Sequence, residues 1–236
     1  MRTAGVHSKD DSVRVAPGAA VICVSLGNRS VDAVESALRG FDFAEVRLDL
    51  IQPALSELER LFTPGKRIIA TCRAGSLKDE ERIALLRRAI ELGAAFVDVE
   101  KESTVAFKAK VMQVALSRGC RVIISSHDLR NTPPAEVLRS TIQQSFGEGA
   151  DYVKIACTVN APQDNATLLG LLSNPEWQQR LIVVGMGTLG RFSRIMGPLL
   201  GSPFTFASSG EGSETAPGQP TRKELLEIWK CMGVAR

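Results

Sequence analysis

The chain has 236 residues, a length that suits one domain because single α/β barrels commonly reach about 200 to 250 residues. Its 29 Lys and Arg against 26 Asp and Glu leave a net charge of +3, which is too balanced and too scattered for a nucleic-acid-binding surface. No apolar run approaches the roughly 18 residues that a membrane-spanning helix needs, so neither nucleic acid nor a membrane is an expected partner.

Five cysteines are the first chemical feature to weigh, because paired thiols would indicate disulfides or a metal site. They are odd in number, far apart and without a CxxC pair: Cys23, Cys72, Cys120, Cys157 and Cys231. This pattern predicts reduced thiols in a cytoplasmic protein, with neither a disulfide framework nor a zinc site.

The first 18 residues are polar, and we expect them to form a flexible tail before a single domain at residues 19–236. The apolar stretch VAPGAAVICVSL, residues 15–26, raises the alternative of a secretion signal. Two aspartates precede this stretch, and Pro17 and Gly18 interrupt it, which disfavours a signal peptide.

Short runs rich in Val, Ile, Ala and Phe recur along the rest of the chain, and each has the length and composition of a buried strand. Eight such runs lie at residues 21–27, 43–50, 67–73, 94–100, 121–128, 152–157, 181–187 and 204–208. Successive runs begin 22 to 31 residues apart, which leaves room for one helix between neighbouring strands.

Helical patterns occupy the segments after these runs, with Ser30 and Thr221 as candidate N-caps. The segments are 30–40, 53–62, 79–93, 103–118, 133–147, 162–172, 191–201 and 221–233. Strict alternation of strands and helices predicts an α/β fold, specifically a compact (β/α)8 TIM barrel. A doubly wound open sheet is the alternative, but VSLGNRS after the first run lacks the glycine-rich phosphate turn of such sheets.

Alternation along each strand separates side chains that face the helices from those that face the barrel interior. In the second strand, Leu48 falls on the apolar face while Glu45 and Arg47 fall on the other. The polar residues predicted to face inward are Ser25, Glu45, Arg47, Asp49, Thr71, Arg73, Asp98, Glu100, Ser125, His127, Tyr152 and Lys154.

Charged groups inside a barrel need an explanation, because burying an isolated charge costs several kcal/mol in order of magnitude unless it is paired and hydrogen-bonded. Here four carboxylates accompany three cations, mostly near the C-terminal strand ends where barrel enzymes place their active sites. This interior predicts an enzyme, whereas a structural barrel would use Val, Ile and Leu. A structural ion network of Glu45, Arg47 and Asp49 is a competing interpretation.

Lys154 lies between Val153 and Ile155, where burial and nearby positive charge lower the pKa of an amine and favour the neutral form that attacks a ketone. The alternative interpretations are that Lys154 is one half of a structural salt bridge and that His127 is an ordinary core histidine with its hydrogen bonds made. Together, Lys154, His127 and Glu100 on successive strands resemble imine chemistry with general acid/base assistance. Glu100 could accept a hydrogen bond from His127 and fix its tautomer.

These residues lie within a series of motifs that runs from about residue 21 to the C-terminus: ICVSL, EVRLD, ATCR, VDVE, SSHD, YVKIA, GMGTLGRFSR and APGQ. The series resembles that of the type I 3-dehydroquinate dehydratases, the Schiff-base dehydratases of the shikimate pathway. The resemblance implies dehydration of the small molecule 3-dehydroquinate to 3-dehydroshikimate, the third step of that pathway.

Within the family, the lysine of the KIA motif forms an imine with the substrate ketone, which corresponds to Lys154. The histidine before the aspartate of SSHD moves the protons, which corresponds to His127, and the glutamate closing the fourth strand positions it, here Glu100. The family's substrate contacts correspond to Ser25, Glu45, Arg47, Arg73, Arg194, Thr215 and Gln219. Thr215 stands where the family has serine, and its extra methyl group would narrow the pocket.

Imine formation acidifies the neighbouring proton because the resulting carbanion delocalises as an enamine, so we expect no metal and no organic cofactor. Arg194 offers a forked donor suited to the carboxylate of the substrate. A phosphate cradle in GMGTLGRFSR, residues 185–194, is the alternative for that segment.

The polar, glycine-rich segment SSGEGSETAPGQP, residues 208–220, contains Thr215 and Gln219. We expect a mobile lid that closes over the substrate and excludes water, with an ordinary surface loop as the alternative.

Two other functions compete with the dehydratase. Another lysine-imine lyase, such as a class I aldolase, would share Lys154 but would usually need a phosphate site. A non-catalytic barrel that senses quinate-like metabolites could dispense with Lys154, His127 and Glu100, all of which are present. A homodimer is expected from the family resemblance, although no apolar patch in the sequence identifies an interface.

Overall fold

Eight parallel strands form a single sheet in this computed structural model, which describes residues 20–27, 30–63 and 65–234. The strands are β1 Ile22–Leu26, β2 Phe43–Arg47, β3 Arg67–Thr71, β4 Phe96–Glu100, β5 Arg121–Asp128, β6 Tyr152–Thr158, β7 Leu181–Met186 and β8 Thr205–Ser208. Their order in the sheet is β7-β6-β5-β4-β3-β2-β1-β8. The tail predicted at residues 1–18 lies outside the described residues.

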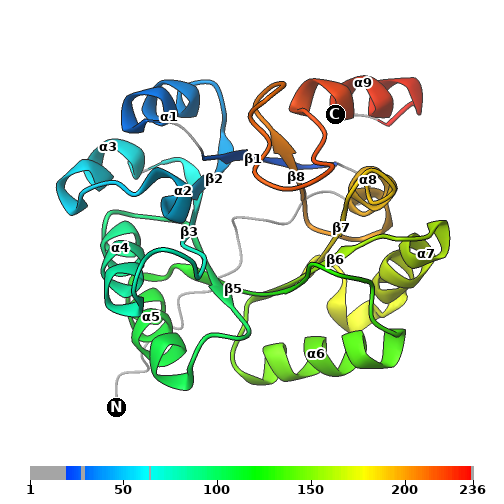
Figure 1. Cartoon of the computed structure of the whole chain (residues 1–236), viewed down its shortest axis with the longest axis horizontal. Helices are drawn as coiled ribbons and strands as arrows, with labels where there is room; N and C mark the ends of the chain where they lie inside the picture. Colours follow the sequence, from blue (N-terminus) through cyan, green and yellow to red (C-terminus); the bar gives the residue numbers. More distant parts are fainter. Residues whose placement is uncertain (1–19, 28–29, 64, 235–236) are drawn as a thin grey trace, which may run out of the picture.

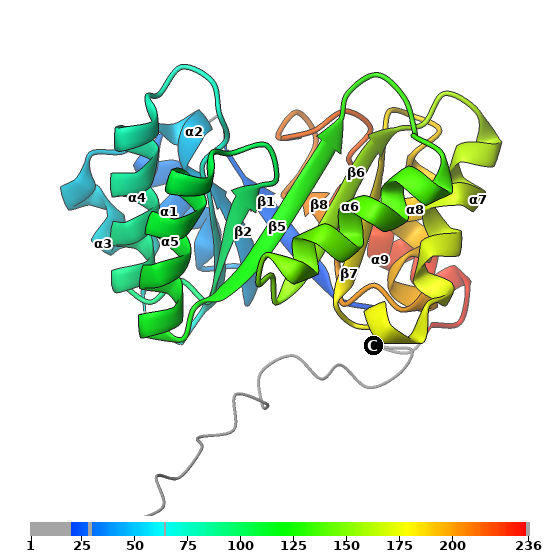
Figure 2. The same ribbon diagram turned by 90° about the horizontal axis from the view of Figure 1, so that it is seen from below.

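Helices surround the strands, as Figure 1 shows for the described part of the chain. They are α1 Val31–Leu38, α2 Leu48–Ile51, α3 Leu58–Leu61, α4 Asp79–Glu91, α5 Val105–Arg118, α6 Ala135–Gly147, α7 Pro162–Gly170, α8 Arg191–Met196 and α9 Arg222–Cys231. Figure 2 shows β5 and β6 rising inside this ring of helices. The predicted (β/α)8 barrel is confirmed. None of the helices in the described residues is long and apolar enough to cross a membrane.

Alternation along the strands separates two apolar layers. Val24, Val46, Val97 and Ile155 belong to the larger layer, which packs between the strands and the helices. The intervening strand residues face the barrel axis and form a second cluster. The parity read from the sequence therefore assigns strand side chains to the correct layer.

Four aromatic rings form the floor of the barrel. Phe43, Phe96 and Tyr152 are the first residues of β2, β4 and β6, and Phe204 directly precedes β8. Their neighbouring ring centroids lie 4.9 to 6.5 Å apart, mostly in edge-to-face or tilted geometry. Because this floor closes the N-terminal end, polar groups of the interior must lie toward the carboxyl ends of the strands.

The seam between β7 and β8, the two ends of the hydrogen-bonded order, is bridged by a side chain of α8. Ser193 Oγ accepts a hydrogen bond from Gly185 N at 2.6 Å. Arg194 donates through Nε to Gly185 O at 2.9 Å and through Nη1 to Phe206 O on β8 at 3.4 Å. Arg194 is therefore held in place by closure of the barrel itself.

The predicted second strand, 43–50, is too long. β2 ends at Arg47, and Leu48–Ile51 form the short helix α2. Asp49 is therefore not an inward-facing strand residue, as the alternation predicted; it binds Arg47 at 3.0 Å to Nε and 2.7 Å to Nη2. The alternation missed the end of the strand because Leu48 is buried in either conformation.

The predicted N-caps of the first and last helices are confirmed. Ser30 Oγ accepts from Ala33 N at 3.3 Å. Thr221 and Glu224 form a reciprocal capping box, with bonds of 3.1 Å and 2.7 Å. Since Ser208 N also donates to Pro220 O at 2.9 Å, the two ends of the 208–220 segment are fixed close together.

Truncation of the aromatic floor tests its contribution to stability. Phe204→Ala removes a side chain with 0% exposure and leaves a cavity among three rings, so we expect a loss of about 3 to 5 kcal/mol in the free energy of unfolding. Phe192→Ala, at a ring that is 54% exposed, is the matched control and should change it by less than about 0.5 kcal/mol. Urea unfolding measures both; equal losses would contradict a packed floor.

Candidate active site

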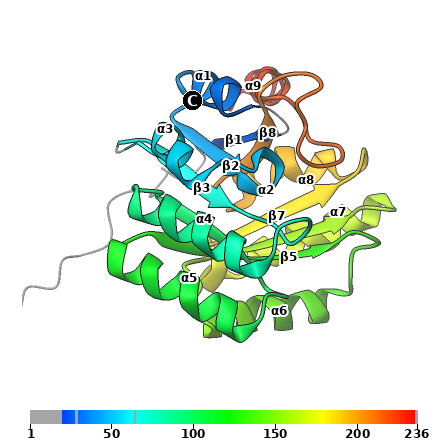
Figure 3. The same cartoon turned by 60° about the vertical axis from the view of Figure 1, so that its left-hand side comes forward.

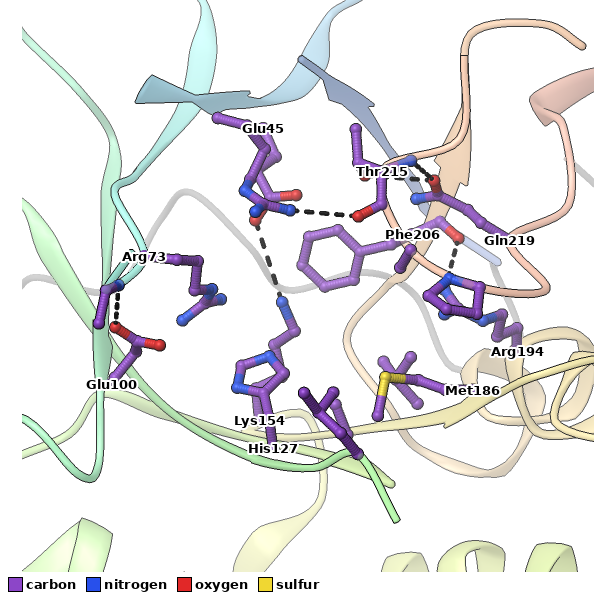
Figure 4. Close-up of a pocket in the computed structure, with 17 residues that line it drawn as sticks. Glu45, Arg73, Glu100, His127, Lys154, Met186, Arg194, Phe206, Thr215 and Gln219 are labelled. Atoms are coloured by element: carbon purple, nitrogen blue, oxygen red, sulfur yellow. Dashed lines mark hydrogen bonds and ion pairs between the residues drawn. The ribbon is translucent and has the colours of Figure 1, made fainter. Parts of the chain in front are cut away.

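A pocket of about 300 Å³ lies above the aromatic floor, at the carboxyl ends of the strands (Figure 4). Nine of the ten predicted site residues line it: Glu45, Arg47, Arg73, Glu100, His127, Lys154, Arg194, Thr215 and Gln219. The tenth, Ser25, lies behind this lining and contacts both Glu45 and Thr215. The fold thus gathers all ten residues at one place.

Lys154 of β6 is 6% exposed and is surrounded by inward residues of the other even-numbered strands. Its Nζ lies 3.5 Å from Asp98 Oδ2, 3.9 Å from Glu45 Oε1 and 4.1 Å from the centroid of the Phe206 ring. Figure 4 shows the amine reaching toward Glu45. These four residues form one layer of the barrel interior, with the amine at its centre.

The pKa of Lys154 is lowered from its ordinary value. Burial is the largest cause, because it penalises the ammonium form. Glu45 and Asp98 oppose this change, while the positive charges of Arg73 and Arg47 add to it. The environment therefore increases the fraction of neutral, nucleophilic amine while holding its side chain in a fixed position.

Asp98 connects Lys154 to a second cation. Arg73 binds it through two parallel hydrogen bonds of 2.8 and 2.7 Å, and Ser125 Oγ donates to it at 2.5 Å. Burial alone would raise the pKa of Asp98, but Arg73 and Lys154 hold it well below the usual range. Asp98 is thus a permanent negative charge below the pocket.

Glu45 is held by hydroxyl groups. Its Oε2 accepts from Ser25 Oγ at 2.5 Å and its Oε1 accepts from Thr71 Oγ1 at 2.9 Å. Thr215 Oγ1 in turn donates to Ser25 Oγ at 2.7 Å. A continuous chain of hydrogen bonds therefore runs from the 208–220 segment to the carboxylate beside Lys154.

The 208–220 segment, here called the lid, lies against the mouth of the barrel beside the carboxyl end of β7 (Figure 3). Arg47 Nη1 donates to Thr215 O at 3.3 Å, and Gly187 N donates to Pro217 O at 3.1 Å. A Cβ at Gly218 would lie 2.2 Å from Gly187 O, so only glycine fits there. The lid is docked on both sides of the pocket.

His127 of β5 faces the pocket from the strand next to that of Lys154. Burial, followed by the charges of Arg73 and Lys154, lowers the pKa of His127 to about 2. The imidazole is therefore neutral, with one ring nitrogen able to accept a proton.

The carboxylate of Glu100 binds Ala74 and Arg82, whereas the sequence predicted a contact with His127. Its Oε2 accepts from Ala74 N at 2.8 Å and from Arg82 Nη2 at 2.7 Å. Within the described residues, the structure contains no hydrogen bond between Glu100 and His127. The predicted fixing of the histidine tautomer by Glu100 thus has no contact to support it, and Arg82 is a partner that sequence reasoning did not identify.

Arg194 retains an unused donor. The side chain is 1% exposed, and burial lowers its pKa to about 10. Its Nη2 is buried without a hydrogen-bond partner in the described structure, although the residue lines the pocket. Since such a donor is costly to leave unpaired, it is suited to an anionic group of a ligand.

Comparison with known proteins gives a consistent result. Residues 22–236 match the family described as type I 3-dehydroquinase. The chain is 34% identical over 224 residues to the 3-dehydroquinate dehydratase of Pyrococcus abyssi, covering 92% of this chain and 99% of that protein. The chain belongs to the type I 3-dehydroquinase family. It is also 38% identical over 193 residues to the enzyme of Thermococcus gammatolerans, covering 79% of this chain and 86% of the other.

Solved structures of the family share the fold. The 3-dehydroquinate dehydratase of Aquifex aeolicus aligns with a TM-score of 0.75 at 26% identity, covering 89% of this chain and 98% of the other. That of Geobacillus kaustophilus HTA426 aligns with a TM-score of 0.80 at 24% identity, covering 91% of each. The match to this family confirms the resemblance seen in the motifs.

The activity of this type I 3-dehydroquinase follows from the family: it is a 3-dehydroquinate dehydratase of the Schiff-base class in the shikimate pathway, EC 4.2.1.10. The aldolase and sensor alternatives are thereby set aside. In the described part of the chain, no group of three or more His, Cys, Asp or Glu side chains could hold a metal ion.

Sequence reasoning missed the apolar wall of the pocket, which includes Val184, Met186 and Phe206. The alternation that identified the polar groups of the first six strands applies equally to β7 and β8. Ala156 of β6, which lines the pocket, pairs with Val184, so the parity extends across that strand pair. The same rule could have found all three residues.

The lowered pKa of His127 predicts a pH-dependent contribution to stability. Because the folded-state pKa of about 2 lies below the ordinary unfolded value of about 6.5, the unfolded chain takes up the proton first. The stability of the wild type relative to His127→Gln should be constant above about pH 7.5 and fall below about pH 6.5, by at most about 1.4 kcal/mol per pH unit. Urea unfolding between about pH 5 and pH 8 measures this difference; a pH-independent difference would contradict the shift.

Proposed function

We propose that this 3-dehydroquinate dehydratase forms its imine through Lys154. The observation that supports this most is the position of the amine: it is buried in the pocket, its pKa is lowered, and Asp98, Glu45 and Phe206 hold it from three sides. A neutral amine attacks the ketone, and loss of water from the resulting carbinolamine produces the imine.

His127 is proposed as the group that moves the protons. A neutral imidazole can remove the proton beside the imine carbon, after which the imidazolium can donate to the departing hydroxyl. The substrate carries a carboxylate, and a negative charge in the pocket raises the pKa of His127 from its low value toward a useful range. Substrate binding thus makes the imidazole a stronger base when it is needed.

Arg194 is proposed to bind the substrate carboxylate. Arg194 lines the pocket and its buried Nη2 has no hydrogen-bond partner in the described structure, so a carboxylate within reach would satisfy it. The same anion would offset the cost of burying the guanidinium, which is also the cause of its lowered pKa. A carboxylate therefore suits this site, and the alternative of a phosphate cradle at residues 185–194 is not needed.

The hydroxyl groups of the substrate are proposed to bind polar residues of the opposite wall and the lid: Ser25, Glu45, Arg47, Arg73, Thr215 and Gln219. The contacts of Thr215 with Ser25 and Gln219 support this placement, because they bring hydroxyl and amide groups of the lid to the pocket. Closure of the lid would exclude water from the imine.

The chemistry requires no metal and no organic cofactor, since the enamine itself stabilises the carbanion. We also propose that the protein is a cytoplasmic homodimer that binds neither nucleic acid nor a membrane. The cysteines in the described residues are all unpaired, which is consistent with a reducing compartment.

Replacement of Lys154 tests the imine. Lys154→Ala should abolish the covalent adduct that borohydride reduction traps with 3-dehydroquinate, because among the described residues Lys154 is the only lysine that lines the pocket. Mass spectrometry with peptide mapping detects the adduct, and Lys223→Ala, at a side chain that is 85% exposed, is the matched control. An adduct trapped in folded Lys154→Ala would refute the assignment.

Replacement of His127 separates imine formation from proton transfer. His127→Ala should still yield the borohydride-trapped adduct, more slowly, while kcat falls by about 10²- to 10⁴-fold through loss of the general acid/base. Ultraviolet absorbance of the enone product gives kcat. Turnover close to that of the wild type would exclude His127 from the mechanism.

A further inference from the structure

Arg82 is not among the residues that line the pocket. Its guanidinium group nevertheless contacts the backbone next to Arg73, which does line the pocket. The residue lies on α4 and is 3% exposed, and the guanidinium stacks 4.5 Å above the Phe107 ring. Its Nη1 binds Asp79 at 2.8 Å, and its other two nitrogens point toward the β3–α4 turn. A buried guanidinium is costly unless it is paired and hydrogen-bonded, and these partners offset that cost.

The contacts of Arg82 fall on one side of Arg73. Arg82 Nε and Nη2 both donate to Cys72 O, at 3.1 and 3.0 Å. This carbonyl belongs to the peptide group that directly precedes Arg73. The guanidinium of Arg82 therefore fixes the orientation of that peptide group.

Glu100 provides the contact on the other side. Its Oε2 accepts from Ala74 N, in the peptide group that directly follows Arg73, at 2.8 Å. The same oxygen accepts from Arg82 Nη2 at 2.7 Å. One ion pair thus holds both peptide groups that flank Arg73.

β3 ends at Thr71, so Cys72 and Ala74 lie beyond the strand. Cys72 is buried, and a buried carbonyl without a ladder partner must find a side chain or water, which Arg82 provides. Ala74 is exposed, and the bond from its N to Glu100 Oε2 holds it in place of water. Once both peptide groups are fixed, the direction in which the Arg73 side chain leaves the backbone is fixed as well. Asp98 then orients the far end of that side chain.

We propose that Arg82 and Glu100 act together as positioning residues that hold Arg73 in the pocket. This inference rests on the proposed role of Arg73 as a substrate contact. It differs from the role that the family resemblance implies for Glu100, because here the carboxylate acts on the β3–α4 turn and not on the imidazole of His127.

The two roles of Glu100 predict different results for Glu100→Gln. A glutamine oxygen can accept both hydrogen bonds that Glu100 Oε2 accepts, so in the positioning role KM changes by less than about 3-fold and the pH profile of kcat is unchanged. If the negative charge acted on His127, its loss would shift that pH profile. A shifted profile would overturn the proposal.

Variants that remove the contacts should weaken substrate binding. Arg82→Met retains the stem above Phe107 but loses every donor, and Glu100→Leu loses the acceptor. Each should raise KM about 10-fold while kcat changes by less than about 3-fold, because chemistry at Lys154 and His127 is retained. Arg88→Met, at a half-exposed arginine on the same helix, is the matched control and should leave both constants unchanged.

A double-mutant cycle with Arg73 distinguishes positioning from a general structural defect. If Arg82 acts through Arg73, then Arg82→Met should change KM by less than about 2-fold in an Arg73→Met background. Independent, multiplicative effects on KM would overturn the proposal. If Arg82→Met does not fold, the double variant Arg82→Met/Glu100→Leu removes the unpaired charge and takes its place in the cycle.

Failure of this inference is distinct from failure of the proposed function. Borohydride trapping of wild type with 3-dehydroquinate tests the imine independently of Arg82. A trapped adduct together with an unchanged KM in folded Arg82→Met would leave the imine in place and reject the positioning role.

Discussion

The candidate active site is built around one buried amine, Lys154, which lies between two carboxylates and an aromatic ring. Asp98 and Glu45 favour the charged form of Lys154, the Phe206 ring also attracts the ammonium, and burial favours the neutral form. The net effect lowers the pKa of Lys154 and so raises the fraction of neutral amine, while both carboxylates keep a cationic neighbour. Each of those carboxylates is then stabilised by its own donors, Arg73 and Ser125 for Asp98, Ser25 and Thr71 for Glu45.

In a barrel, simple alternation of side chains along the strands is enough to produce this arrangement. Inward residues of alternate strands meet at one level, so the aromatic floor and the level that contains Lys154 come from the same four strands. The buried aromatic floor closes the lower end of the barrel, and residues of the lid line the pocket at the upper end. Glu45, Asp98, Lys154 and Arg194 are buried above the floor, where electrostatic interactions are stronger than in water.

The fold and most residues of the pocket were predictable from the sequence. The fold follows from the regular spacing of strands and helices, and the pocket residues follow from the alternation of side chains along each strand. Lys154, His127 and Asp98 lie on strands whose alternation is unambiguous. Asp49 was misplaced, since apolar residues at positions 48 and 50 suit a strand and a buried helical turn equally. The partners of Glu100 were beyond prediction, because Arg82 reaches it from a helix and no strand pattern encodes that approach.

Arg194 joins Gly185 and Phe206 across the gap between β7 and β8, and the same residue lines the pocket with a buried Nη2 that has no hydrogen-bond partner in the described structure. A single side chain therefore closes the barrel wall and also lines the pocket. A descendant of this barrel that had lost catalysis would still need the arginine to keep its wall intact. Retention of this residue in a distant homologue is thus poor proof of enzymatic competence.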